Sequence, residues 1–241
     1  MEVTRYTPEE ILQILNDQYH CQAVFDPEVD EGDDLTFATT IQEWRDTCDL
    51  IDPKSLAKVE HRSFQLATPV QELEIILSTE TTTLLGFCRY ISDHAVKLTV
   101  SPVMSLGTPC MSAAIFKTLT ANLKERGVDV QHIRPSSKLA PIFNKHGGIL
   151  LTEVSKFAPG AFTKFEYEQN RISRTGGNFI LLFLLSIIVV PFVWHFHWML
   201  LLPLGIGILL WYIGSKFPPA KEVIGGYYTL RELVMAMQAR M

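Results

Sequence analysis

The sequence predicts a mainly α-helical protein built from three parts. Residues 1–170 should form a compact, soluble, cytoplasmic helical domain with a short β-pair, residues 175–215 a two-helix transmembrane hairpin, and residues 216–241 a cytoplasmic tail with an amphipathic helix. Three observations lead to this fold class: a long uncharged apolar stretch, a series of helix-start signals, and an apolar stripe in the tail. A helical part of about 170 residues has the usual size of one domain.

The uncharged stretch covers residues 175–215 and contains no Asp, Glu, Lys or Arg. A bilayer core is about 30 Å thick, and one helix needs roughly 20 apolar residues to cross it. A single helix over this stretch would be about 60 Å long. We therefore expect a hairpin that turns within Trp194, His195, Phe196, His197 and Trp198, because Trp favours the interface and His is polar. Since each arm would have only about 17 residues, a shallow re-entrant hairpin is the alternative.

Positive charge brackets this stretch on both sides. Arg171 and Arg174 precede it, and Lys216 and Lys221 follow it. Basic residues favour the cytoplasmic side of a membrane. We therefore expect an integral, two-pass membrane protein with both termini in the cytoplasm and the lipid bilayer as a partner.

Helix starts in the first half of the chain are marked by capping residues, several followed by Pro or by a Glu at the third helical position. Apolar residues at helical spacing follow each start, so we expect helices of about ten residues with short connections, packed as a bundle. The starts are Thr7, Thr40, Asp52, Thr68, and Thr82 or Thr83. On the third helix we expect Leu56, Val59 and Phe64 to point inward. The acidic residues 25–34 lack periodicity and should form a loop that does not match the calcium-binding pattern.

The second half of the domain mixes helical and extended signals. Residues 96–103 alternate and are β-like at a sheet edge, and Thr108 should begin the longest helix, which Gly127 ends. Residues 138–145 should form a short helix stopped by a Gly pair. We expect residues 128–133 and 149–154 to be strands that pair beside the bundle.

The tail carries the clearest amphipathic helix. Thr229 and Glu232 form a capping-box pattern, and Leu230, Leu233, Val234 and Met237 follow at i, i+3, i+4 and i+7. Because so short a helix is marginal alone, it needs a surface to fold against. We expect it to complete the core of the domain.

Charge is distributed unevenly along the chain. The net charge is −5, but residues 1–60 hold 15 acidic and 4 basic residues, a balance of −11, whereas the remaining 11 acidic and 17 basic residues give +6. We expect the acidic N-terminal half to bind a protein partner and the basic half to lie near anionic headgroups. Clustered surface charge without a partner is the alternative. No nucleic-acid partner is expected.

One polar cluster suggests an anion-binding or phospholipid-headgroup site. Backbone N–H groups at a Ser-led helix start and at a Gly pair can cradle an anion, and nearby bases would reinforce the binding. A normally capped helix with a solvated loop is the alternative. The candidate residues are Arg134, Ser136, Ser137, Lys138, Lys145, His146, Gly147 and Gly148.

Diagnostic catalytic patterns such as GxGxxG, GxSxG, HExxH and paired CxxC are missing from the sequence. We therefore assign no catalytic residue, no metal site and no cofactor, and expect Cys48 and Cys88 to be buried free thiols. The expected function is that of a membrane-anchored interaction or scaffold protein. The alternatives are a membrane-surface enzyme acting on an amphipathic substrate near residues 134–148, and a small subunit of a larger membrane complex.

Overall fold

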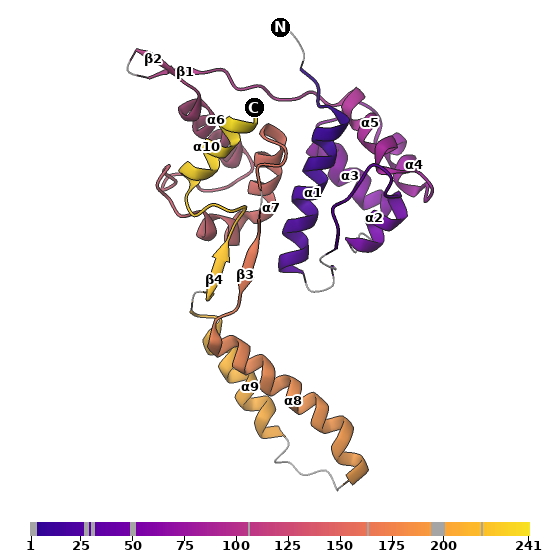
Figure 1. Ribbon diagram of the computed structural model, residues 1–241, viewed down its shortest axis with the longest axis vertical. Helices are drawn as coiled ribbons and strands as arrows, with labels where there is room; N and C mark the ends of the chain where they lie inside the picture. The colour runs from indigo at the N-terminus through magenta and orange to yellow at the C-terminus, as the bar shows by residue number, and fades with distance from the viewer. Residues whose placement is uncertain are drawn as a thin grey trace. The chain divides into compact units, whose positions relative to one another are not determined.

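A computed structural model describes residues 4–26, 29, 32–48, 52–105, 107–162, 164–193, 201–217 and 219–241 (Figure 1). The described chain is mainly helical, as predicted, with short two-stranded sheets. Its internal contacts divide it into two compact units. The first unit comprises residues 1–165 and 223–241, and the second comprises residues 166–222.

The N-terminal part of the first unit is a bundle of helices, coloured indigo to magenta in Figure 1. Its members are α1 (Pro8–Phe25), α2 (Ile41–Thr47), α3 (Pro53–Ser63), α4 (Val70–Ser78) and α5 (Leu84–His94).

Side-chain caps begin three of these helices at the predicted residues. Thr7 and Thr40 each form a complete capping box with the Glu three positions later, and Asp52 accepts from the first backbone N–H groups of α3. The caps of α4 and α5 differ, because the N-cap residues Pro69 and Thr83 form no side-chain cap hydrogen bond. The capping pattern therefore predicts helix starts even where the side chain itself does not cap.

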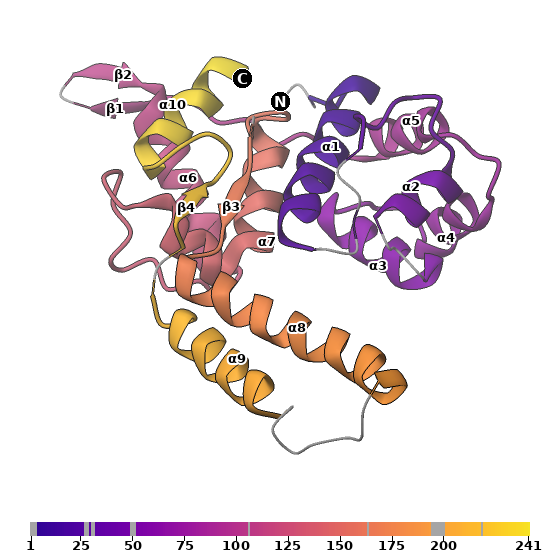
Figure 2. The ribbon, with the colours of Figure 1, turned by 60° about the horizontal axis from the view of Figure 1, so that its bottom comes forward.

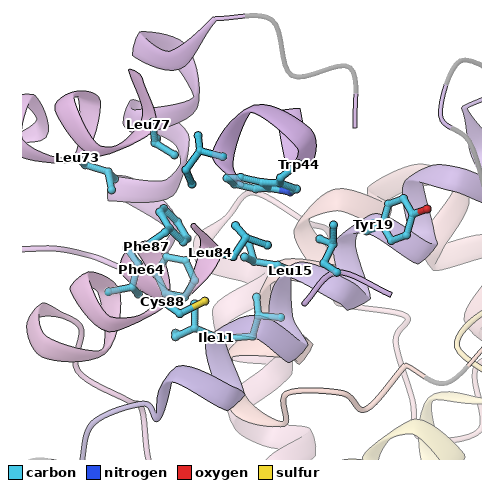
Figure 3. Packing of buried hydrophobic residues seen from close by; sticks show 14 of the residues in the cluster. Ile11, Leu15, Tyr19, Trp44, Phe64, Leu73, Leu77, Leu84, Phe87 and Cys88 are labelled. Carbon is cyan, nitrogen blue, oxygen red and sulfur yellow. The ribbon is translucent and has the colours of Figure 1, made fainter. Parts of the chain in front are cut away.

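The first hydrophobic cluster fills this bundle (Figure 3). The rings of Trp44 on α2 and Phe87 on α5 lie 5.5 Å apart between centroids. The predicted inward face of α3 is only partly correct: Phe64 is buried, but Val59 is 58% exposed. Glu60, the residue after Val59, is buried instead of Val59 and lies on the same helical face as Ala57.

The C-terminal part of the first unit forms the second hydrophobic cluster from α6 (Met111–Glu125), α7 (Leu139–Phe157) and α10 (Leu230–Arg240). α6 and α10 lie side by side in both views (Figures 1 and 2). The predicted stripe of α10, from Leu230 to Met237, is fully buried in this cluster. The tail helix therefore completes a core, as predicted.

The predicted strands at residues 128–133 and 149–154 are wrong. The first is a turn with no regular strand, and the second lies inside α7, where Leu150 and Val154 are buried at the i, i+4 spacing of a helix. The antiparallel pair occurs earlier in the chain, between β1 (Val103–Ser105) and β2 (Thr108–Cys110). It turns at Gly107, whose φ of 82° favours glycine. Thr108 consequently lies in a strand, and the N-cap of α6 is Cys110, two residues later than the predicted cap. With 15 residues, α6 is also shorter than α1 and α7, so it is not the longest helix of the domain.

The second unit is a helical hairpin on a short strand pair. β3 (Glu166–Glu168) pairs with β4 (Lys221–Val223), and α8 (Arg171–Val193) packs antiparallel against α9 (Leu201–Gly214). Glycines allow the two helices to approach closely. A Cβ at Gly176 would lie 2.5 Å from the backbone nitrogen of Trp211, and one at Gly207 would lie 3.0 Å from the carbonyl oxygen of Gly176.

Within the described residues, the structure contains no helix with both the length and the apolar character needed to cross a membrane. The predicted transmembrane hairpin and the integral, two-pass localisation are therefore wrong. Part of α8 is polar, since it begins with Arg171 and includes Arg174, and the apolar run from Phe179 to Val193 rises only about 22 Å. α9 has 14 residues and rises about 21 Å, also less than the bilayer core.

The predicted turn of the hairpin, with its two histidines, lies outside the described residues. The lipid bilayer as a partner was expected also from the basic half of the chain, and it stays a prediction.

Candidate functional site

The loop between α6 and α7 carries the predicted basic residues, and the start of α10 fixes it in place. Three backbone hydrogen bonds connect the two segments: Leu139 N–H to Tyr228 O at 2.9 Å, Leu230 N–H to Ser137 O at 3.0 Å, and Arg231 N–H to Pro135 O at 2.8 Å. The loop is thus held to the second hydrophobic cluster by main-chain contacts. Val128 of the loop is buried in that cluster, whereas Arg134, Ser136 and Lys138 are exposed.

A closed turn shapes this loop just before α7. The Ser137 N–H donates to Arg134 O at 2.9 Å, and the Arg134 N–H donates to Ser137 Oγ at 2.9 Å. Because its hydroxyl is used in this turn, Ser137 does not cap α7. The N-cap is Lys138, which provides no side-chain cap hydrogen bond.

Four of the predicted residues line one pocket of about 450 Å³. We call it the basic pocket. Asp129 and His132 complete its polar lining and are not among the predicted site residues; both lie in the turn region that was expected to be a strand. The polar lining residues are Asp129, His132, Ser137, Lys138, Lys145 and His146, and the apolar ones are Val128, Ile133, Pro141 and Ile142.

The other four predicted residues do not line the basic pocket. Arg134 and Ser136 are exposed outside it, and Gly147 and Gly148 are helical positions within α7. The predicted stop at the Gly pair is wrong, because α7 bends at His146 (φ −140°, ψ 29°) and continues. Gly147 has a packing role there: a Cβ would lie 3.0 Å from the ring of Phe143.

The basic pocket has a positive balance of charge, since two lysines oppose one aspartate. The carboxylate of Asp129 also accepts a hydrogen bond from the Gln131 N–H at 3.0 Å, which orients it within the turn. Lysine ammonium groups bind phosphate and carboxylate groups as point charges. The arrangement therefore suits an anionic group.

A second pocket, of about 550 Å³, lies in the acidic N-terminal half. We call it the acidic pocket. Asp33, Asp34 and Glu43 line it together with Tyr19, Leu35 and small or hydroxyl-bearing residues, and no Lys or Arg is among the residues that line it. The acidic composition of residues 25–34 was the only signal in the sequence, and it does not reveal that Glu43 of α2 joins the loop.

Hydrogen bonds to α1 hold the wall of the acidic pocket in place. Asn16 forms two of them with the backbone of Leu35, at 2.8 and 3.0 Å, and the Gly32 N–H donates to the hydroxyl of Tyr19 at 2.7 Å. The capping box of α2 lowers the pKa of Glu43, because its carboxylate accepts from the backbone and hydroxyl of Thr40. His20 of α1 lies 2.9 Å from Oδ1 of Asp34, so one of the three carboxylates of this wall has a partner, and Asp33 and Glu43 complete its acidic lining.

A third polar cluster is buried where α7 faces α1 and α3. The carboxylate of Glu153 accepts from Arg126 at 3.2 Å, from Asn122 at 3.0 Å and from Lys156 at 3.4 Å. Lys156 also provides the positive charge nearest to the buried Glu60 of α3, whose pKa burial raises to about 7. One oxygen of Glu60 has no hydrogen-bond partner among the described residues.

Asp17 of α1 is a second buried carboxyl at this junction. Its Oδ2 accepts from the hydroxyl of Ser155 at 2.9 Å and from the N–H of Gly160 at 3.0 Å. Burial nevertheless raises the pKa of Asp17 to about 7, opposed by these hydrogen bonds and by Arg240. The junction between the two hydrophobic clusters is thus rich in ionisable groups.

The cysteines give no catalytic arrangement. Cys48 and Cys88 are buried and free, as predicted, and burial raises the pKa of their thiols to about 11 and about 12. Cys21 behaves similarly, with a pKa of about 12. Among the described residues, no group of His, Cys, Asp and Glu could hold a metal ion.

The described geometry therefore offers built binding pockets of opposite charge. No protein-family model, no curated protein and no solved structure matches this chain.

Proposed function

We propose that this chain is an interaction protein whose acidic pocket binds a basic segment of a partner protein. The observation that carries the proposal is the concave wall of Asp33, Asp34 and Glu43, which no Lys or Arg lines. A partner that places Lys or Arg side chains there would gain charge complementarity, which steers association and selects against acidic competitors.

Two further features support a role in binding. Residues 1–60 carry the excess of 11 negative charges, so the field around the pocket attracts basic partners. The second unit exposes large apolar side chains on both of its helices, such as Leu182 and Leu209 at 57% each. Exposed apolar side chains that gather on one surface are typical of contacts with other molecules.

The proposal is tested by calorimetric titration of the full chain with a decalysine peptide at about 0.15 M salt. Asp33→Asn with Asp34→Asn should weaken binding about tenfold, a change equal to about 1.4 kcal/mol. The control is Asp46→Asn with Asp93→Asn, which removes the same charge from exposed positions outside the pocket. Equal weakening by both pairs would mean that only net charge attracts the peptide, and the pocket would lose its role.

A second function, anion binding, is favoured by the basic pocket. The four predicted residues that converge there include Lys138 and Lys145, which can hold a phosphate or carboxylate group of a ligand. We infer that this pocket binds such a group independently of the acidic pocket.

Titration with inorganic phosphate, followed by phosphorus NMR, tests anion binding. Lys138→Gln with Lys145→Gln should abolish the saturable shift, whereas Lys117→Gln with Lys124→Gln, two exposed positions on α6, should preserve it. A shift that both pairs reduce equally, or no saturable shift in the unaltered chain, would contradict the inference.

A further inference from the structure

A third pocket, of about 390 Å³, lies between the start of α6 and α10, and we call it the apolar pocket. Its size falls within the range of sites that bind small ligands. Most of its lining is apolar, and one side chain is charged. The lining residues are Ser112, Ala113 and Phe116 of α6, Pro135 of the loop between α6 and α7, and Arg231, Val234 and Met235 of α10.

Arg231 is the charged residue of this lining. A hydrogen bond fixes its backbone, and its guanidinium is available to bind a ligand. The backbone N–H of Arg231 donates to Pro135 O at 2.8 Å, which holds the first turn of α10 against the loop. The side chain is exposed and forms no ion pair with any other residue that the structure describes. A guanidinium presents donors in a planar fork that matches a carboxylate in a bidentate geometry.

The facing wall also stabilises negative charge. Ser112 lies in the first turn of α6, a helix of 15 residues, whose N-terminal end carries the positive end of the helix dipole. Hydrogen bonds from Ser112 and from the backbone of Ala113 lower the pKa of the neighbouring Cys110 thiol. This end of α6 and the Arg231 guanidinium thus favour an anion at one boundary of an otherwise apolar cavity.

We propose that the apolar pocket binds an apolar carboxylate of the fatty-acid type, with the carboxylate on Arg231 and the chain against Ala113, Phe116, Val234 and Met235. Because the lining combines one guanidinium with apolar side chains, it is complementary to a ligand that is anionic at one end and apolar along the rest. A neutral lipid alcohol would leave the guanidinium without its partner, and a free inorganic anion would leave the apolar wall uncovered.

The test is calorimetric titration of the full chain with dodecanoate below its micelle concentration. Arg231→Gln should weaken binding tenfold or more, because a bond to a charged group is lost. Arg134→Gln, a nearby exposed arginine outside the pocket, is the matched control and should leave the affinity unchanged. Dodecanol should bind more weakly than dodecanoate and should not distinguish Arg231→Gln from the unaltered chain.

A second variant tests the cavity without changing any charge. Ala113→Phe should fill the cavity and abolish the saturable binding, with folding checked by circular dichroism. Dodecanoate held by the exposed apolar helices of the second unit would survive this substitution, so only the binding that is lost belongs to the pocket. The proposal would be overturned if Arg231→Gln and Arg134→Gln lost the same dodecanoate affinity, or if dodecanol bound as tightly as dodecanoate. Full binding of dodecanoate by folded Ala113→Phe would also overturn it.

Discussion

The carboxyl of Glu60 is 4% exposed, and one of its oxygens has no hydrogen-bond partner among the described residues. Desolvation disfavours its ionised form, and the opposing charge of Lys156 only partly compensates. Lys156 is itself shared with Glu153, which Arg126 also neutralises. Glu60 is therefore a buried acid without a dedicated counter-charge.

We predict that Glu60 makes folding stability fall as the pH rises. Its pKa of about 7 in the folded chain lies above the ordinary 4.5, so the folded state holds the proton more tightly than the unfolded state. The contribution of the protonated form is complete below about pH 4.5 and is lost as the pH approaches 7. Urea unfolding between pH 4.5 and 8 should show a loss on the order of 1–3 kcal/mol from this group.

Glu60→Gln should flatten much of that decline and stabilise the chain at pH 8, because the amide keeps its shape without a charge. Glu80→Gln, at an exposed turn residue, is the control and should leave the pH profile unchanged. A Glu60→Gln profile that parallels the unaltered one would show that this carboxyl does not titrate with folding. Asp17, the other buried acid of the junction, would account for any decline that remains.

Single residues also show what a sequence cannot reveal. Hydrophobicity favours Val59 over Glu60 as the inward residue of α3, yet Glu60 is buried and interacts with the charge of Lys156 on α7. That information belongs to a helix about a hundred residues away. Of the basic residues that the sequence singles out, Lys138 and Lys145 line the basic pocket, whereas Arg134 lies in a turn outside it that the pattern does not specify.

Among the elements, the antiparallel contact of α8 and α9 depends on individual glycines. Gly176 faces α9 with no room for a Cβ, whereas Gly177, the next residue, has open space around it. Asn170 adds a polar connection at the same end, donating to the carbonyl of Gly214 at 2.9 Å. Adjacent glycines of one helix thus differ entirely in their surroundings.

We predict that Gly176→Val separates α8 from α9, because the new side chain would collide with the backbone near Trp211. Hydrogen exchange followed by mass spectrometry should show faster exchange in α9 by at least tenfold, a cost of about 1.4 kcal/mol or more. Gly177→Val carries the same change in helix propensity without the collision and should leave α9 protected. If the two variants exchange alike, the glycine contact does not hold the hairpin together.

Element types were predictable where a cap and a helical stripe agree, as in α1, α2 and α10. They were not predictable in α7, where residues 149–154 are apolar enough for a strand. A short apolar run fits a buried strand and a buried helix equally well. The preceding Gly pair misled further, because a glycine ends a helix only where the backbone turns left-handed, as at Gly127 (φ 84°).

The two hydrophobic clusters of the first unit differ in how the chain assembles them. The first is built from residues 6–95, in one continuous region of sequence. The second combines residues 115–165 with residues 224–237, which lie beyond the whole of the second unit. α10 is therefore a long-range part of that core.

We predict that Leu233→Ala lowers the free energy of unfolding by about 2–5 kcal/mol, because it leaves a cavity where Leu233 is fully buried. Met235→Ala, two residues away on the same helix and 51% exposed, should cost less than about 1 kcal/mol. Urea unfolding monitored by circular dichroism measures both. Similar losses would show that α10 does not stabilise the second cluster by burial.

At the scale of the whole molecule, the uncharged run of residues 175–215 indicated a hairpin but not its lengths. Its apolar content exceeds that of any one helix, since the run is divided between α8 and α9 and part of it lies outside them. The transmembrane interpretation is wrong because no described helix has both the length and the apolar character needed to cross a membrane. The uneven distribution of charge along the chain can be read from the sequence. Only the folded chain shows that acidic residues line one pocket and basic residues line another.

The return of the chain to its first unit after residue 222 also bears on the order of events during synthesis. A ribosome adds roughly 5–20 residues per second, so the 57 residues of the second unit (166–222) occupy about 3–11 s. Throughout that interval α6 and α7 have been made but α10 has not, so the apolar surface that α10 covers in the folded chain lacks that partner. A nascent-chain chaperone would find its binding surface there, and would lose it once the last helix is made and docks.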